Sequence, residues 1–142
     1  MKVEELMNKS AVTVSPEESV RCAAELMRRY NVGVLPVCAH GGRLRGVVTD
    51  RDIVLRSVAG EGEASDTPVS EIMTRAAVTV SPEEDVADAA ARMRENRVRR
   101  VPVVQDGRVV GVLSLGDLAR QRECAVEAAR ALTEICGNLR RL

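Results

Sequence analysis

The sequence predicts a mixed α/β (α+β) fold made of two copies of a β-α-β-β-α unit, followed by an extra C-terminal helix. The first observation behind this prediction is an internal repeat: residues 11–18, Ala-Val-Thr-Val-Ser-Pro-Glu-Glu, recur unchanged at 77–84. The second is that short β-branched runs alternate with helical apolar patterns in both halves. A repeat of this length indicates that the chain was built from one supersecondary plan used twice.

The repeat also predicts how the 142 residues divide. The two copies stay 66 residues apart until the turn at His40–Gly42, where one extra residue reduces the offset to 65. We expect repeat 1 over 1–60, a polar linker over 61–68, repeat 2 over 69–122 and a helical extension over 123–142. Because a repeat of this size buries only a marginal core, the two sheets are expected to pack together about a pseudo-twofold axis.

Each copy opens with a short lead-in and a strand. Residues 3–7 and 69–73 carry apolar side chains at helical spacing, which predicts one turn of helix. The β-branched residues 12–14 and 78–80 predict a short strand. A Ser-Pro step then turns the chain, because the residue before a proline avoids the helical region.

The middle of each copy predicts a helix and a hairpin. Ser19 and Asp85 are suitable N-caps for helices of about 11 residues with apolar stripes of Val, Ala and Met. Glycine-containing turns then separate pairs of apolar runs, which predicts β-hairpins. The predicted strands are 34–38 with 43–48, and 100–104 with 108–113.

The candidate chemistry lies where the second hairpin strand meets the last helix. Thr49 and Asp52 stand one helical turn apart there, and Ser114 and Asp117 repeat the pattern. The free N–H groups of a first helical turn favour an anion, and a carboxylate can accept hydrogen bonds from two ribose hydroxyls. The same spacing also fits a capping box, in which both side chains only satisfy the helix itself. The residues alone leave both interpretations open.

Composition argues against several other functions. Basic and acidic residues balance at 21 each, and the chain has no Trp or Phe, so a nucleic-acid partner is not expected. No apolar run is long enough for a membrane span and no export signal is visible, which favours the cytoplasm. The four cysteines lack paired spacing, so neither a metal site nor a disulfide framework is expected. No nucleophile, base or metal set indicates an enzyme.

Together these motifs resemble a tandem pair of CBS domains, often called a Bateman module. The resemblance covers 3–57 and 69–121. It rests on V-T-V-S-P-E-E, on V-x-x-L-P-V at 32–37 and V-R-R-V-P-V at 98–103, and on G-V-V-T-D-R-D and G-V-L-S-L-G-D. It implies a stand-alone, non-enzymatic sensor that binds an adenosyl ligand such as AMP, ADP, ATP or S-adenosylmethionine in clefts between the repeats. It also implies a homodimer formed through helices, and an unknown target protein.

The resemblance implies a first set of ligand residues drawn from both repeats. In it, Thr49 meets phosphate, Asp52 holds the ribose and Val78 lies near adenine. Arg99 and Arg100 occupy the positions whose basic side chains bind phosphate. Because consecutive strand residues point to opposite faces, one of these arginines is equally compatible with a solvated position.

A second set has less positive charge. Its members are Ser114, Asp117, Val12, Gly33, Val34 and Arg51. Here the residues that match the basic positions are uncharged, and Arg51 is the nearby cation. We therefore expect the first set to hold a phosphate-bearing nucleotide, and the second to be empty or to hold a less anionic ligand. The alternative function is a ligand-free dimerisation and interaction module.

Overall fold

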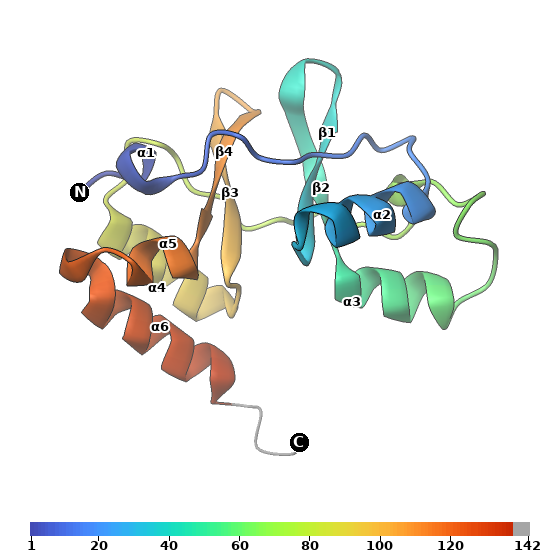
Figure 1. Cartoon of the computed structure of the whole chain (residues 1–142). Coiled ribbons are helices and arrows are strands. Elements are labelled where there is room, and N and C mark those ends of the chain that lie inside the picture. Colours follow the sequence, from blue (N-terminus) through green and yellow to red (C-terminus); the bar gives the residue numbers. More distant parts are fainter. Residues whose placement is uncertain (138–142) are drawn as a thin grey trace. The chain divides into compact units, whose positions relative to one another are not determined.

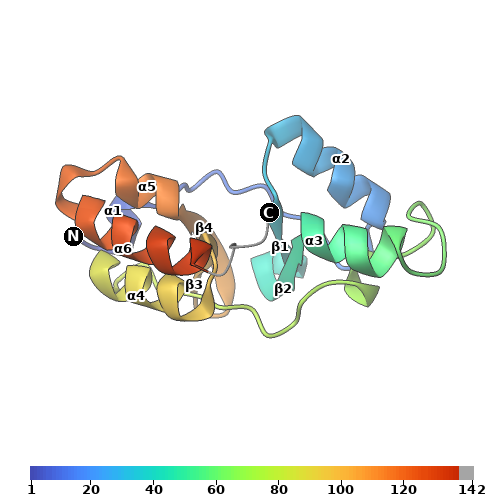
Figure 2. The ribbon, with the colours of Figure 1, turned by 90° about the horizontal axis from the view of Figure 1, so that it is seen from below.

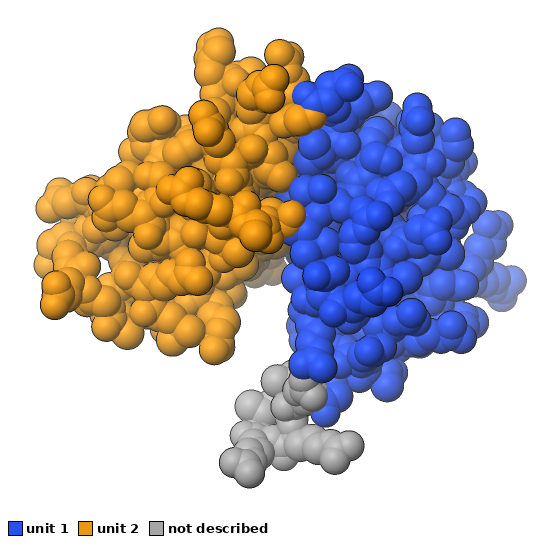
Figure 3. All heavy atoms as spheres, turned by 180° about the vertical axis from the view of Figure 1, so that it is seen from behind, with its two compact units in different colours: residues 1–11, 78–106, 110–142 blue, residues 12–77, 107–109 orange. Residues whose placement is uncertain are grey.

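The computed structural model describes residues 1–137, which fall into two compact units of helices and strands (Figure 3). Of the described residues, unit 1 comprises 1–11, 78–106 and 110–137, and unit 2 comprises 12–77 and 107–109. The mixed α/β class is confirmed. The last five residues of the predicted extension, 138–142, lie outside the described part.

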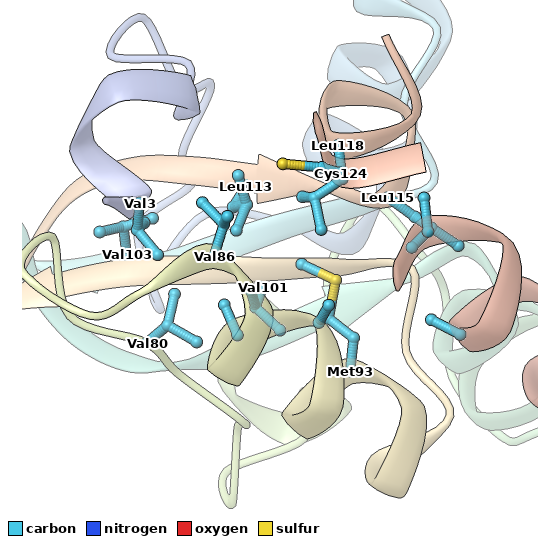
Figure 4. Packing of buried hydrophobic residues seen from close by; sticks show 14 residues of the cluster. Val3, Val80, Val86, Met93, Val101, Val103, Leu113, Leu115, Leu118 and Cys124 are labelled. Carbon is cyan, nitrogen blue, oxygen red and sulfur yellow. The ribbon is translucent and has the colours of Figure 1, made fainter. Parts of the chain in front are cut away.

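Each unit takes its lead-in segment from the other repeat. Helix α1 (Val3–Leu6) belongs to unit 1, where the N–H of Val3 donates to the carbonyl of Glu84 at 2.9 Å. Val3 is fully buried beside Val103 in the core of that unit (Figure 4). The matching 3-10 turn Val69–Glu71 packs into the core of unit 2. Aligning the copies identifies equivalent segments, but it does not tell which copy each segment packs against.

The two long helices form where the sequence predicts them. Helix α2 (Val20–Tyr30) is capped by the hydroxyl of Ser19, which accepts a backbone hydrogen bond at 3.1 Å. Helix α4 (Val86–Asn96) is capped by the carboxylate of Asp85 at 2.9 Å. Their stripes of Val, Ala and Met point into the two aliphatic cores. Each fully buried Val, Leu or Met side chain contributes about 1.5–3 kcal/mol of hydrophobic stabilisation.

Two antiparallel hairpins supply the strands. Strand β1 (Val34–Ala39) pairs with β2 (Arg43–Thr49) across a 3-10 turn in unit 2. Strands β3 (Arg100–Gln105) and β4 (Arg108–Ser114) form the second hairpin. Arg43 of β2 pairs with Arg108 at the start of β4, and both residues belong to unit 2.

The predicted strand at the start of each copy is longer than the observed one. Residues 12–14 and 78–80 each make a single parallel bridge to the following hairpin. The bridges are Val14 to Val37 and Val80 to Val103. A proline follows two positions after each bridging valine, so the next ladder step has no N–H donor.

The last elements differ between the units. In unit 2, α3 (Asp50–Ile53) continues into a π-helical turn (Val54–Val58) and lies beside α2 (Figure 1). In unit 1, α5 (Leu115–Ala119) leads through a 3-10 turn to α6 (Ala125–Cys136). The predicted C-terminal helix is therefore confirmed.

Helix α6 packs on α4 and α5, as Figure 2 shows. Ala128 and Ala131 are its buried residues. The corresponding helices of unit 2 keep large apolar side chains exposed, namely Tyr30, Val54, Leu55 and Val58. On α6 of unit 1, Val126 and Leu132 are exposed as well, so both units leave apolar side chains on a helical surface.

Candidate functional site

The first hydroxyl–carboxylate pair lies in unit 2, where β2 runs directly into α3. The hydroxyl of Thr49 accepts a hydrogen bond from the N–H of Asp52 at 3.0 Å. In return, Oδ2 of Asp52 accepts from the N–H of Thr49 at 3.0 Å. This is a reciprocal capping box, as the capping interpretation predicts.

The Asp52 carboxylate has further partners that the spacing does not reveal. The hydroxyl of Thr74 lies 3.4 Å from Oδ1 and 3.3 Å from Oδ2. The guanidinium of Arg56 lies 3.8 Å from Oδ1. With these neighbours, the side chain of Asp52 keeps only 10% of its surface exposed.

The second pair repeats the arrangement in unit 1, where β4 runs into α5. The hydroxyl of Ser114 accepts from the N–H of Asp117 at 3.1 Å, and Oδ2 of Asp117 accepts from the N–H of Ser114 at 2.8 Å. Oδ1 of Asp117 pairs with the guanidinium of Arg120, an exposed residue of the next turn. The two pairs thus share their capping geometry but differ in the partners of the carboxylate.

The start of the hairpin lies against each helix start. In unit 2, the N–H of Asp50 donates to the carbonyl of Gly33 at 2.9 Å. A side chain on Gly33 would place its Cβ 2.9 Å from Oδ2 of Asp50, so the position is next to a carboxylate. Val34 pairs in register with Thr49, and Arg51 is exposed on α3. The uncharged segment at Gly33 therefore lies next to the negatively charged carboxylate of Asp50.

The same segment in unit 1 has the opposite character. The N–H of Leu115 donates to the carbonyl of Arg99 at 2.8 Å. Arg99 and Arg100 are both exposed, and the residue equivalent to Asp50 is the buried Leu115. The guanidinium of Arg99 lies 3.9 Å from the sulfur of Cys136. Two guanidinium groups beside the uncharged Leu115 suit an anion better than Gly33 does beside the Asp50 carboxylate.

The predicted ligand residues are divided between the two units. Val12, Gly33, Val34 and Arg51 belong to unit 2 with Thr49 and Asp52, whereas Val78, Arg99 and Arg100 belong to unit 1 with Ser114 and Asp117. Val12 and Val78 are half-buried against the cores of their units. Each predicted set draws on both units, and its membership stays a prediction.

Several residues of the site were missed by sequence reasoning. Arg56 and Arg120 follow the aspartates by four and three residues, a helical spacing that could have indicated ion pairs. Asp50 stands next to the pair, and its contact with Gly33 needed the hairpin register. Thr74 is 22 residues from Asp52, and no local signal connects them.

The described part of the chain contains neither a candidate metal site nor a candidate membrane-spanning helix. No cluster of three or more His, Cys, Asp or Glu side chains there is arranged to hold a metal ion. Across residues 1–137, no helix is both long and apolar enough to cross a membrane.

Comparison with known families decides the relationship. The family model of the CBS domain matches the chain twice, over residues 3–58 and 69–123. The chain belongs to the CBS-domain family. The CBS-domain protein YhcV of Bacillus subtilis is 41% identical over 133 residues, which is 94% of each chain.

Solved CBS structures give the same relationship. The CBS-domain protein PAE2072 of Pyrobaculum aerophilum, complexed with AMP, is 32% identical with a TM-score of 0.78, covering 91% of this chain and 98% of that one. The CBS-domain pair of protein MJ0100, in complex with 5′-methylthioadenosine and S-adenosyl-L-methionine, is 30% identical with a TM-score of 0.74 and covers 84% and 94%. CBS-domain pairs similar to this chain thus bind adenosyl compounds.

Proposed function

We propose that this CBS-domain protein is a non-enzymatic regulatory module that binds an adenosyl ligand and signals the binding to a partner protein. One observation carries the proposal. In both units a strand ends in a hydroxyl residue and a helix begins with a carboxylate three residues on, in a chain similar to CBS pairs solved with AMP and with S-adenosylmethionine. The carboxylates suit the ribose hydroxyls, and the hydroxyl residues suit phosphate.

The charges near the two helix starts favour different ligands. We propose that Arg99 and Arg100 bind phosphate together with Thr49 and Asp52, because guanidinium groups form charge-assisted and bidentate bonds to phosphate oxygens. The set of Ser114 and Asp117 has Gly33 at the equivalent position, where the Asp50 carboxylate repels an anion. That set therefore suits an adenosyl compound with less negative charge, such as 5′-methylthioadenosine.

A ligand that contacts both repeats can act as a regulator by shifting a conformational equilibrium. It does so by as much as its affinity differs between the two states. In this role the chain catalyses no reaction, and a partner protein responds to the change in conformation.

Isothermal titration calorimetry tests the proposal. AMP, ATP, S-adenosylmethionine and 5′-methylthioadenosine are titrated into wild type, Asp52→Ala and Asp117→Ala. We expect Asp52→Ala to remove AMP binding at the first set and leave only weak binding at the second, and Asp117→Ala to leave most of the AMP binding. Equal losses in the two variants contradict the assignment of phosphate to the first set. Circular dichroism of each variant controls for loss of the capping box.

The second candidate function is a ligand-free dimerisation module. The exposed apolar residues of α2 and the π-helical turn favour it, because Val54, Leu55 and Val58 lie within one short segment and are each more than half exposed. Analytical ultracentrifugation of Leu55→Glu and Val58→Glu tests this, with Val126→Glu on α6 as the matched exposed control. If the protein is a dimer through α2 and α3, only the first two variants dissociate.

Thermal shift separates the two candidates. A ligand that binds only the folded chain raises the melting temperature by mass action. Absence of a shift with every adenosyl compound, together with a dimer that depends on Leu55 and Val58, supports the interaction module.

A further inference from the structure

The Asp52 carboxylate accepts hydrogen bonds both from the start of its own helix and from a segment of unit 2 that is distant in sequence. Oδ2 accepts from the N–H of Thr49 at 3.0 Å and from the hydroxyl of Thr74 at 3.3 Å, while Oδ1 is 3.4 Å from that hydroxyl and 3.8 Å from Arg56. A carboxylate offers about four acceptor positions. Since the side chain is only 10% exposed, a ligand with two hydroxyls must replace a partner already present.

Thr74 is the partner that is easiest to replace. Its hydroxyl is uncharged, and both of its distances exceed the usual range for an O–H···O bond. The bond from the N–H of Thr49 belongs to the capping box, and the contact with Arg56 is between opposite charges. A strong hydrogen bond from a hydroxyl to an ionised carboxylate is about 2.5–2.7 Å long, so the longer Thr74 distances indicate a weak bond.

The segment that carries Thr74 is also held by its backbone and by the core of unit 2, in which Ile72 and Met73 are buried. Thr74 exchanges two backbone hydrogen bonds with Val47 of β2, at 2.8 and 2.9 Å. Arg56 donates to the carbonyls of Ile72 and Met73 at 3.1 and 3.3 Å. Arg56 therefore touches both the carboxylate and the segment, so a change at Asp52 reaches residues 72–74 by two routes.

Unit 1 differs at the equivalent position. Asn8 matches Thr74 and makes the same backbone bridge, to Val112. Its side-chain oxygen accepts from the N–H of Ser10 at 2.9 Å, whereas Asp117 pairs with Arg120 of its own helix. The connection between carboxylate and lead-in segment is therefore a property of the Asp52 pair.

We propose that the Thr74 hydroxyl occupies the place on the Asp52 carboxylate that a ligand hydroxyl takes on binding, so that ligand binding frees this hydroxyl and loosens the backbone around Thr74. The proposal rests on the proposed function and adds how binding is transmitted: the lead-in of the second repeat, at residues 72–74, responds to the ligand. Thr74 acts as a positioning residue for Asp52. The ligand class is an adenosyl compound with a free ribose diol.

Thr74→Val tests the exchange, because valine keeps the shape and removes only the hydroxyl. We expect AMP and 5′-methylthioadenosine to bind about 2- to 5-fold more tightly to Thr74→Val, since one weak competing hydrogen bond is removed. Thr74→Ser retains the hydroxyl and should bind as wild type. Thr67→Val is the matched control, because the Thr67 hydroxyl donates to the carbonyl of Glu63 in the same unit.

Hydrogen exchange gives a second readout that a purely structural role would not change. In wild type, saturating AMP should speed exchange of the amides of residues 72–75. In Thr74→Val these amides should already exchange faster, with little further response to AMP. If AMP slows exchange there in wild type, the proposal is overturned.

The outcomes separate this inference from the function on which it rests. If wild type binds none of the adenosyl compounds, both are overturned. If wild type binds and Asp52→Ala does not, but Thr74→Val binds equally or more weakly than wild type, only the exchange is overturned. Equal tightening in Thr67→Val also overturns it.

Discussion

Gly46 and Thr74 meet backbone to backbone in unit 2: a Cβ on Gly46 would collide with the carbonyl oxygen of Thr74. Gly111 stands in the same relationship to Asn8, whose carbonyl oxygen would lie 2.9 Å from an added Cβ. Each glycine therefore allows the lead-in segment of the other repeat to bridge β2 or β4. In these two places the absence of a side chain permits the assembly of the unit.

Gly46→Ala and Gly111→Ala should therefore destabilise the protein. Forcing a methyl group into a close backbone contact costs about 1–3 kcal/mol. Urea unfolding followed by circular dichroism measures the loss. Gly116→Ala is the control, because its Cβ would meet only ordinary contacts at 3.6 Å or more. Wild-type stability of Gly46→Ala would show that the segment moves aside without cost.

The two exposed arginines should act on phosphate and not on adenosine. The double variant Arg99→Gln/Arg100→Gln is expected to weaken AMP binding at least about 10- to 100-fold, since the loss of a single charge-assisted bond costs roughly 1.5–3 kcal/mol. Binding of 5′-methylthioadenosine, which has no phosphate, should change little. Calorimetry with both compounds measures the difference, with Arg28→Gln on exposed α2 as control. A parallel loss for both compounds would contradict the phosphate role.

The carboxylate of Asp50 should exclude phosphate from the second set. Asp50→Leu introduces the residue found at the matching position, Leu115, and removes a negative charge beside Gly33. In an Asp52→Ala background, AMP binding should tighten by roughly 1 kcal/mol, the size of a contact between exposed charges. The gain should shrink as salt rises, because screening weakens such contacts. An unchanged affinity at low salt would rule out the repulsion.

The thiol of Cys22 should be unreactive at neutral pH. It donates a hydrogen bond to the Glu18 carboxylate at 2.9 Å, and this bond, with burial and the negative charge, raises the pKa of Cys22 from 9.0 to about 11. Because the thiolate is the nucleophile, alkylation below pH 9 should be about 100-fold slower than for an ordinary thiol. The rate should keep rising up to about pH 11.

Iodoacetamide labelling followed by peptide mass spectrometry measures the rate at Cys22. Glu18→Gln removes the negative charge and should speed the labelling, whereas Glu17→Gln, at an exposed neighbouring position, should not. A rate at Cys22 that levels off near pH 9 in wild type would contradict the effect of Glu18.

Local signals predicted much of the fold. Ser19 and Asp85 cap the helices as expected, and the hairpins lie where the glycine turns indicate. These features depend on residues within a few positions of one another, so the sequence contains all the information they require. The first strands were overestimated, although the prolines at 16 and 82 were visible as missing donors.

The sequence by itself determined that the chain is a duplicated α/β protein of the CBS-domain family, and it located both hydroxyl–carboxylate pairs. Only the tertiary structure decided which lead-in enters which unit, that Thr74 and Arg56 contact Asp52, and that Asp50 lies beside Gly33. The physical reason is distance along the chain. Capping and turn formation depend on neighbours, whereas the partners of a carboxylate depend on segments that meet only when a core is buried.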